Sequence, residues 1–198
     1  MASYLDAIRA GNKEIISDML CQYFNADLNA SLTSLMILEL FEHFNKEIAE
    51  LLFSHSSIKE LASSPSVIDA MTSMMQEDKE EKLLNILPFL SLRKTQWILS
   101  SIERGHNRIV EFLLEEDILP IKAQYIIQAV NYQNHEALLL ILNDGRCHSG
   151  HVKEKVVRKA LHEKRKKVAQ VFMTHIKIDG KIKDRYARVY SELLASEE

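Results

Sequence analysis

Glycine, proline and cysteine are all scarce in this chain, with five glycines, three prolines and two cysteines in 198 residues. Sheet proteins need turn residues often, so the shortage of glycine and proline predicts an all-α protein with short loops. Two distant cysteines exclude a disulfide framework and indicate a reducing compartment such as the cytoplasm. We expect Cys21 to be a small core residue and Cys147 to lie in a solvent-facing loop.

Long apolar runs and a leader segment are also missing. The longest runs, such as Leu138 to Leu142, are far too short to cross a bilayer, so we predict no membrane span. The N-terminus, MASYLDAIRAGNKE, has no apolar stretch after a basic start and therefore predicts no conventional secretory signal. These two features predict a soluble, cytoplasmic protein.

Sequence motifs for catalysis are absent. The chain has no GxxxxGK[ST] or GxGxxG phosphate loop, no HExxH and no GxSxG. The segment RCHSGH (146–151) groups Cys147, His148 and His151, but no second pair of zinc ligands follows at a suitable spacing. We therefore predict no catalytic residue, no metal and no cofactor. An enzyme with an unrecognised site stays an alternative.

A five-residue pattern, apolar–apolar–polar–small–apolar, recurs six times at spacings of 33, 30, 31, 28 and 31 residues. An amphipathic helix explains the alternation but not the recurrence, which indicates a repeat protein. The copies are YLDAI (4–8), ILELF (37–41), VIDAM (67–71), ILSSI (98–102), IIQAV (126–130) and VRKAL (157–161).

A short polar break and a second amphipathic segment follow each copy. The unit is therefore helix, tight turn, helix and linker, and Gly11 and Gly105 suit the ends of first helices. We predict one domain over residues 1–198, an α-solenoid with a C-terminal capping helix at 180–196. The six repeats cover about 2–22, 34–55, 65–91, 96–117, 124–144 and 154–175.

The fragments AIRAGNKEII (7–16) and SIERGHNRIVEFLLEED (101–117) resemble the ankyrin repeat, a pair of antiparallel helices with a β-turn finger. The clearest copy matches the family pattern at Ser101, Gly105, His106, Ile109, Val110, Leu113 and Leu114. The Thr-Pro-Leu-His turn of the family is missing in every copy, and another helical-hairpin solenoid is the alternative. The resemblance implies non-enzymatic binding of a partner protein through the concave face of the array.

The repeat register predicts which side chains face that partner. Trp97 and Tyr125 occupy equivalent positions in adjacent repeats and would supply rigid aromatic contact area, unless both rings pack between the repeats. The predicted partner-binding residues are Trp97, Glu103, Arg104, Tyr125, Asn131, Tyr132 and His162.

Charge is unevenly distributed. Residues 1–150 carry 12 basic and 21 acidic side chains, whereas residues 151–188 carry 13 basic and 4 acidic ones. This basic region is a solvated end of the array, or it binds an acidic partner or nucleic acid. Aromatic residues that would stack on bases are missing there until Phe172, which makes nucleic acid the weaker alternative. The basic patch is Lys153, Lys155, Arg158, Lys159, Lys164, Arg165, Lys166 and Lys167.

The acidic end SELLASEE (191–198) provides one more alternative. It is similar to the glutamate-rich tails of effectors that intracellular bacterial pathogens deliver into host cells, where divergent ankyrin-like arrays are common. This resemblance implies a translocated effector that binds a host protein in the host cytoplasm.

Overall fold

The computed structural model describes residues 2–23, 30–55, 58, 65–77, 79–90, 94–116 and 120–196. Over these ranges the chain is all-helical, with thirteen α-helices, two short 3-10 helices and no strand, so the predicted all-α class is confirmed. The chain divides into two compact units, Met1–Arg93 and Lys94–Glu198. The sequence predicts one uninterrupted array. Its continuity at residues 91–93 lies outside the described ranges and stays a prediction.

The first unit contains two layers of helices. The layer of first helices is α1 (Ala2–Ala10), α3 (Ala30–Glu42) and α6 (Pro65–Gln76), in which each helix packs on the next. The second layer is α2 (Lys13–Tyr23), α4 (Lys46–Phe53), α7 (Glu80–Ile86) and the 3-10 turn η1 (Leu87–Phe89). The predicted second helices at 12–20, 45–53 and 80–90 are therefore all present.

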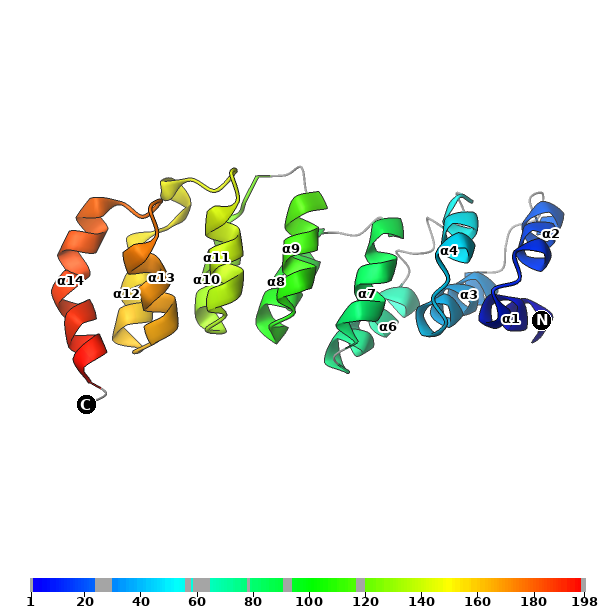
Figure 1. Cartoon of the computed structure of the whole chain (residues 1–198), viewed down its shortest axis with the longest axis horizontal. Helices are drawn as coiled ribbons and strands as arrows, with labels where there is room; N and C mark the ends of the chain where they lie inside the picture. Colours follow the sequence, from blue (N-terminus) through cyan, green and yellow to red (C-terminus); the bar gives the residue numbers. More distant parts are fainter. Residues whose placement is uncertain are drawn as a thin grey trace. The chain divides into compact units, whose positions relative to one another are not determined.

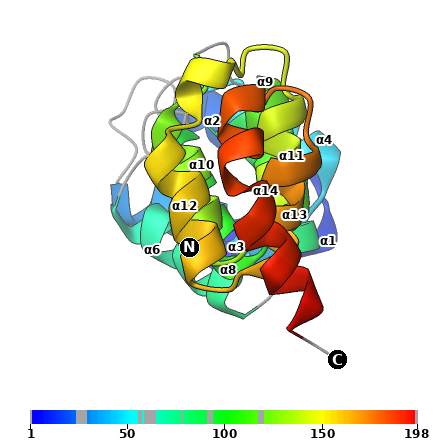
Figure 2. The ribbon, with the colours of Figure 1, turned by 90° about the vertical axis from the view of Figure 1, so that its left-hand side faces the viewer.

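The second unit repeats this arrangement (Figure 1). First helices α8 (Lys94–Arg104), α10 (Ala123–Asn131) and α12 (Glu154–His162) form one layer, and α9 (Asn107–Glu116), α11 (His135–Asn143) and α13 (Lys166–Thr174) form the other. A 3-10 turn, η2 (Ser149–His151), lies in the linker before α12. Helix α14 (Gly180–Ala195) packs on both α12 and α13 and covers that end of the unit (Figure 2).

Four hairpins share one turn geometry. A residue just after the first helix has a left-handed backbone, with φ of 67° at Gly11, 79° at Gly105, 56° at Gln133 and 53° at Lys164. The next backbone N–H donates to the carbonyl of the small residue five positions back, as in Asn134 N to Ala129 O at 2.9 Å. These are the bonds of a helix end that favours glycine. Copies five and six have lost the glycine but keep its conformation.

The positions of the five-residue pattern correspond to the side chains that are buried in the core. Its fifth position is buried in all six copies, and its first position is buried in five, with Tyr4 half-buried. The small residue, at the fourth position, is buried wherever its side chain is described, while the central polar residue keeps access to solvent. The buried fifth positions are Ile8, Phe41, Met71, Ile102, Val130 and Leu161.

Asparagine at the start of a second helix connects neighbouring hairpins. The Oδ1 atom of Asn134 accepts from Ala137 N at 3.0 Å and caps α11. Its Nδ2 atom donates back to the preceding hairpin, to Ile102 O at 3.0 Å and Asn107 Oδ1 at 2.8 Å. Asn45 caps α4 in the same way and lies against Gly11 of the preceding hairpin. The breaks HFN and YQN thus place a residue that bridges two hairpins, whereas the sequence predicts them only as turns.

Both predictions for the cysteines are wrong. Cys21 is exposed near the end of α2, and Cys147 is buried, with 3% of its surface accessible. The stripe of α2 that enters the core contains Ile16, Met19 and Leu20, and Cys21 falls just beyond it. The linker that contains Cys147 folds back against the hairpins, and burial raises the pKa of its thiol.

Candidate functional site

The exposed members of the predicted site lie where the first helices of the second unit end. Glu103 and Arg104 end α8, Asn131 and Tyr132 lie at the end of α10, and His162 ends α12. The three helices pack side by side and run in the same direction, so their ends form one edge of the layer. The fold therefore brings these five residues of three hairpins to the same edge.

Hydrogen bonds connect this edge from hairpin to hairpin. The Tyr132 hydroxyl interacts with the Glu103 carboxylate, and this interaction raises the pKa of Tyr132. Gln128 Nε2 also lies 3.5 Å from Glu103 Oε2. At the next hairpin, Lys159 Nζ donates to Asn131 Oδ1 at 2.7 Å. We call Glu103, Gln128, Asn131, Tyr132 and Lys159 the polar row.

The polar row is accessible as well as ordered. Tyr132 has 47% of its surface exposed, and Glu103, Asn131 and Lys159 are exposed too. An exposed tyrosine beside a carboxylate of the next hairpin offers a large, rigid contact area, a property of many interface hot spots. Lys159, a residue of the predicted basic patch and the central polar residue of its repeat, belongs to this surface through its bond to Asn131.

Trp97 and Tyr125 do not belong to the exposed surface, which corrects the prediction that they form it. Their exposed fractions are 7% and 1%. The Tyr125 hydroxyl lies 3.3 Å from Thr95 Oγ1 on α8, which satisfies its polar group inside the layer. Each ring comes directly before the first position of the five-residue pattern, which is buried in the core. Both rings are packing residues of the second unit.

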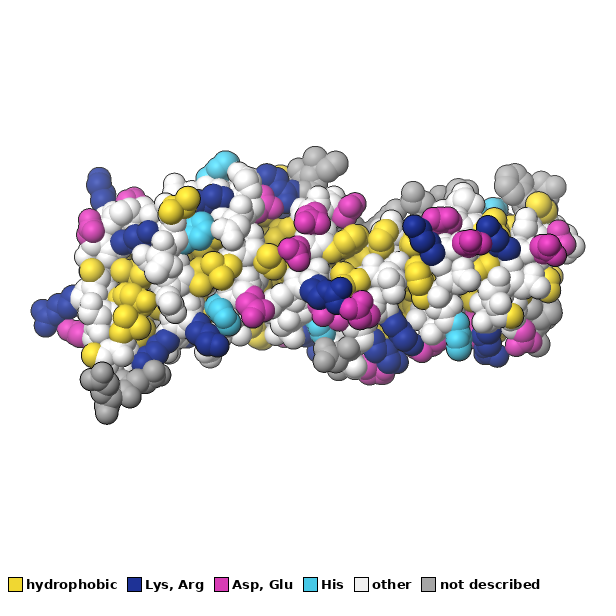
Figure 3. Space-filling view, viewed as in Figure 1, with side chains coloured by type: hydrophobic (Ala, Val, Ile, Leu, Met, Phe, Trp, Pro, Cys, Tyr) yellow, Lys and Arg dark blue, Asp and Glu magenta, His cyan; other side chains and the backbone are white. Residues whose placement is uncertain are grey.

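The predicted basic patch is divided. Lys153 and Lys155 are at the start of α12, whereas Lys164 to Lys167 surround the turn after it, roughly 13 Å further along the helix at 1.5 Å per residue. Arg158 and Lys159 lie between them on α12 and are exposed. On the face in Figure 3 the Lys and Arg side chains are scattered among acidic and uncharged atoms and form no continuous basic surface. The patch therefore contains one dense cluster, Lys164 to Lys167.

The Cys–His cluster of the 144–153 linker forms no metal site in the described part of the chain. The rings of His148 and His151 are stacked, with centroids 5.3 Å apart, and His151 Nδ1 accepts from His148 N at 2.9 Å. Across the ranges that the structure describes, no group of three or more His, Cys, Asp or Glu residues could hold an ion. No helix in those ranges is long and apolar enough to cross a membrane.

No family model, no curated protein and no solved structure matches the chain.

Proposed function

We propose that the chain is a protein-binding module of ankyrin-like helical hairpins, and that the polar row with Arg104 and His162 is its contact surface. The observation that carries the proposal is the convergence of exposed, hydrogen-bonded side chains from three successive hairpins onto one edge. A row of exposed side chains that spans three hairpins offers wide contact to a macromolecule. Binding is the role, and no covalent chemistry is required of these residues.

Two features support the ankyrin-like part of the proposal. The hairpins recur with near-constant spacing, and each described left-handed turn follows the small residue of the five-residue pattern. Stacked hairpins bury each other's apolar faces and leave one edge of first helices free for binding, as repeat proteins commonly do. The missing Thr-Pro-Leu-His turn is a departure from the family.

The test is capture of a partner by the immobilised full chain from a lysate of the cells that express it. In the test variant, Tyr132→Ala is combined with Arg104→Ala and His162→Ala, three exposed residues of the proposed surface. A matched control replaces Leu139, an exposed residue of α11 in the other layer, with alanine. We expect the triple variant to lose at least about tenfold of the captured protein, as removal of an interface hot spot does.

The control should retain wild-type capture, and both variants should keep the wild-type circular dichroism spectrum. Equal capture by the triple variant and the wild type would show that this edge is not the contact surface.

A further inference from the structure

The turn between α12 and α13 contains a cavity of about 450 Å³ that is lined mainly by cations. Four consecutive basic residues, Lys164 to Lys167, contribute to it, together with Gln133, Val168 and Ser196. None of the lining residues that the structure describes carries a carboxylate. Four cations in one short segment repel one another, so the cavity is a place where added negative charge is favourable.

The start of α13 also lacks the side chains that normally stabilise a helix N-terminus. Neighbouring α11 has Asn134 as a side-chain cap and Glu136 in its first turn. Helix α13 has Arg165 at that position, without a side-chain cap bond, and its first turn contains two lysines and no acid. Cations at a helix N-terminus oppose the helix dipole, whereas an anion there would be stabilised.

Arg165 supplies a third and independent observation. Its side chain is 13% exposed, and one guanidinium nitrogen pairs with Glu163. The other, Nη1, is buried and has no hydrogen-bond acceptor among the described residues. A buried donor without an acceptor is costly, and a carboxylate of a bound molecule would satisfy it.

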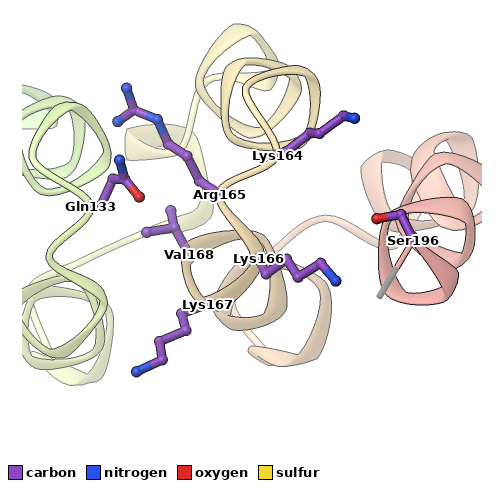
Figure 4. A pocket seen from close by; sticks show the side chains of 7 residues that line it. All are labelled: Gln133, Lys164, Arg165, Lys166, Lys167, Val168 and Ser196. Carbon is purple, nitrogen blue, oxygen red and sulfur yellow. The ribbon is translucent and has the colours of Figure 1, made fainter. Parts of the chain in front are cut away.

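The side chains of the cavity point in two directions (Figure 4). Arg165 extends toward Gln133, while Lys164 and Lys166 extend toward Ser196 at the end of α14. One small anion would reach only one of these groups. An extended molecule with negative charges spaced along it would reach both.

We propose that this basic turn, residues 164–167 with Gln133, binds an acidic polypeptide segment through its Asp and Glu carboxylates. None of the described residues that line the cavity is aromatic and could stack on a base, which favours a polypeptide over nucleic acid. The cavity adjoins Tyr132 through Gln133, so the segment is the acidic part of the partner that the polar row contacts. In that respect the inference rests on the proposed function, but peptide binding tests it separately.

The test measures fluorescence anisotropy of a fluorescein-labelled deca-glutamate peptide with the full chain at about 50 mM salt, where charge pairs are weakly screened. The test variant is Lys164→Gln with Lys167→Gln. Gln133 shows that glutamine adopts the left-handed turn conformation that Lys164 has, so the fold is retained. The matched control is Lys153→Gln with Lys155→Gln, which removes the same charge at the other end of α12.

We expect the test variant to bind the peptide about tenfold more weakly, and the control to change by less than about threefold, because only the first pair contacts the segment. Arg165→Asn should raise the thermal midpoint by restoring the asparagine cap, and should weaken peptide binding at the same time. Tyr132→Ala should leave peptide binding unchanged.

Three results would overturn the inference. Equal losses in the test and control variants would show diffuse charge attraction only. Tighter binding of a ten-nucleotide oligothymidylate than of deca-glutamate would assign the cavity to nucleic acid. The absence of measurable peptide binding by the wild type would remove the site altogether.

Discussion

Asn134 joins two hairpins, and its replacement measures how strongly they are coupled. In Asn134→Ala, α11 loses its cap, which contributes about 1 kcal/mol. The two bonds that Nδ2 donates to Ile102 and Asn107 are lost as well, at about 0.5–1.5 kcal/mol each. We therefore expect the second unit to lose about 2–4 kcal/mol of its free energy of unfolding. For a unit of about 100 residues, this lowers the thermal midpoint by roughly 10 °C or more.

The variant Asn134→Asp separates the two contributions. A carboxylate retains the acceptor that caps α11 and interacts favourably with the helix N-terminus, but it cannot donate to Ile102 O. We expect a loss of about 1–2 kcal/mol, between those of the wild type and the alanine variant.

The assay is urea unfolding followed by the fluorescence of Trp97, the single tryptophan, which is buried in the second unit and reports on that unit. Asn85→Ala, at an exposed position of α7 in the first unit, is the control and should change the free energy by less than about 0.5 kcal/mol. If the aspartate variant were as stable as the wild type, the bonds to the preceding hairpin would contribute nothing, and the coupling argument would fail.

Three further predictions concern single side chains. Ser101→Ala should raise the free energy of unfolding by about 1 kcal/mol, because the Ser101 hydroxyl is buried without a partner in the described residues; an unchanged urea midpoint would refute this. Gln133→Gly should stabilise by about 0.5–1 kcal/mol, since glycine adopts a φ of 56° without strain, and a destabilised variant in the same urea assay would contradict it. Exposed Cys21 should react rapidly with a thiol reagent in the native protein, whereas buried Cys147 should react only in denaturant. Rapid reaction of both thiols in the native protein would contradict the burial of Cys147 in the second unit.

Much of the fold is predictable because the five-residue pattern reflects two physical requirements at once. Its apolar positions must enter the core, and its small residue must precede the left-handed turn whose backbone bonds end the helix. Both requirements can be read from one sequence, so the predicted ends of the hairpins lie close to the observed ones. Gln133 and Lys164 stand where other copies have glycine, and they adopt the same left-handed conformation at the same place in the repeat.

The site is predictable only in part. Register places Glu103, Asn131 and Tyr132 near solvent, and the structure adds the hydrogen bonds that link them to Gln128 and Lys159. Sequence alone could not show whether a ring at the start of a first helix faces solvent or the neighbouring hairpin, so Trp97 and Tyr125 were placed on the wrong side. The bridging asparagines carried a readable signal, since an asparagine before an amphipathic segment is a favoured helix cap.

Photo-crosslinking at the polar row tests the central claim most directly. A photoreactive phenylalanine derivative in place of Tyr132, and separately in place of Leu139 on α11, would be activated in a lysate of the cells that express the chain. The account predicts a discrete adduct from position 132 that excess unlabelled chain suppresses, and none from position 139. An adduct from position 139 alone, or equal adducts from both positions, would contradict a binding surface at the ends of α8, α10 and α12.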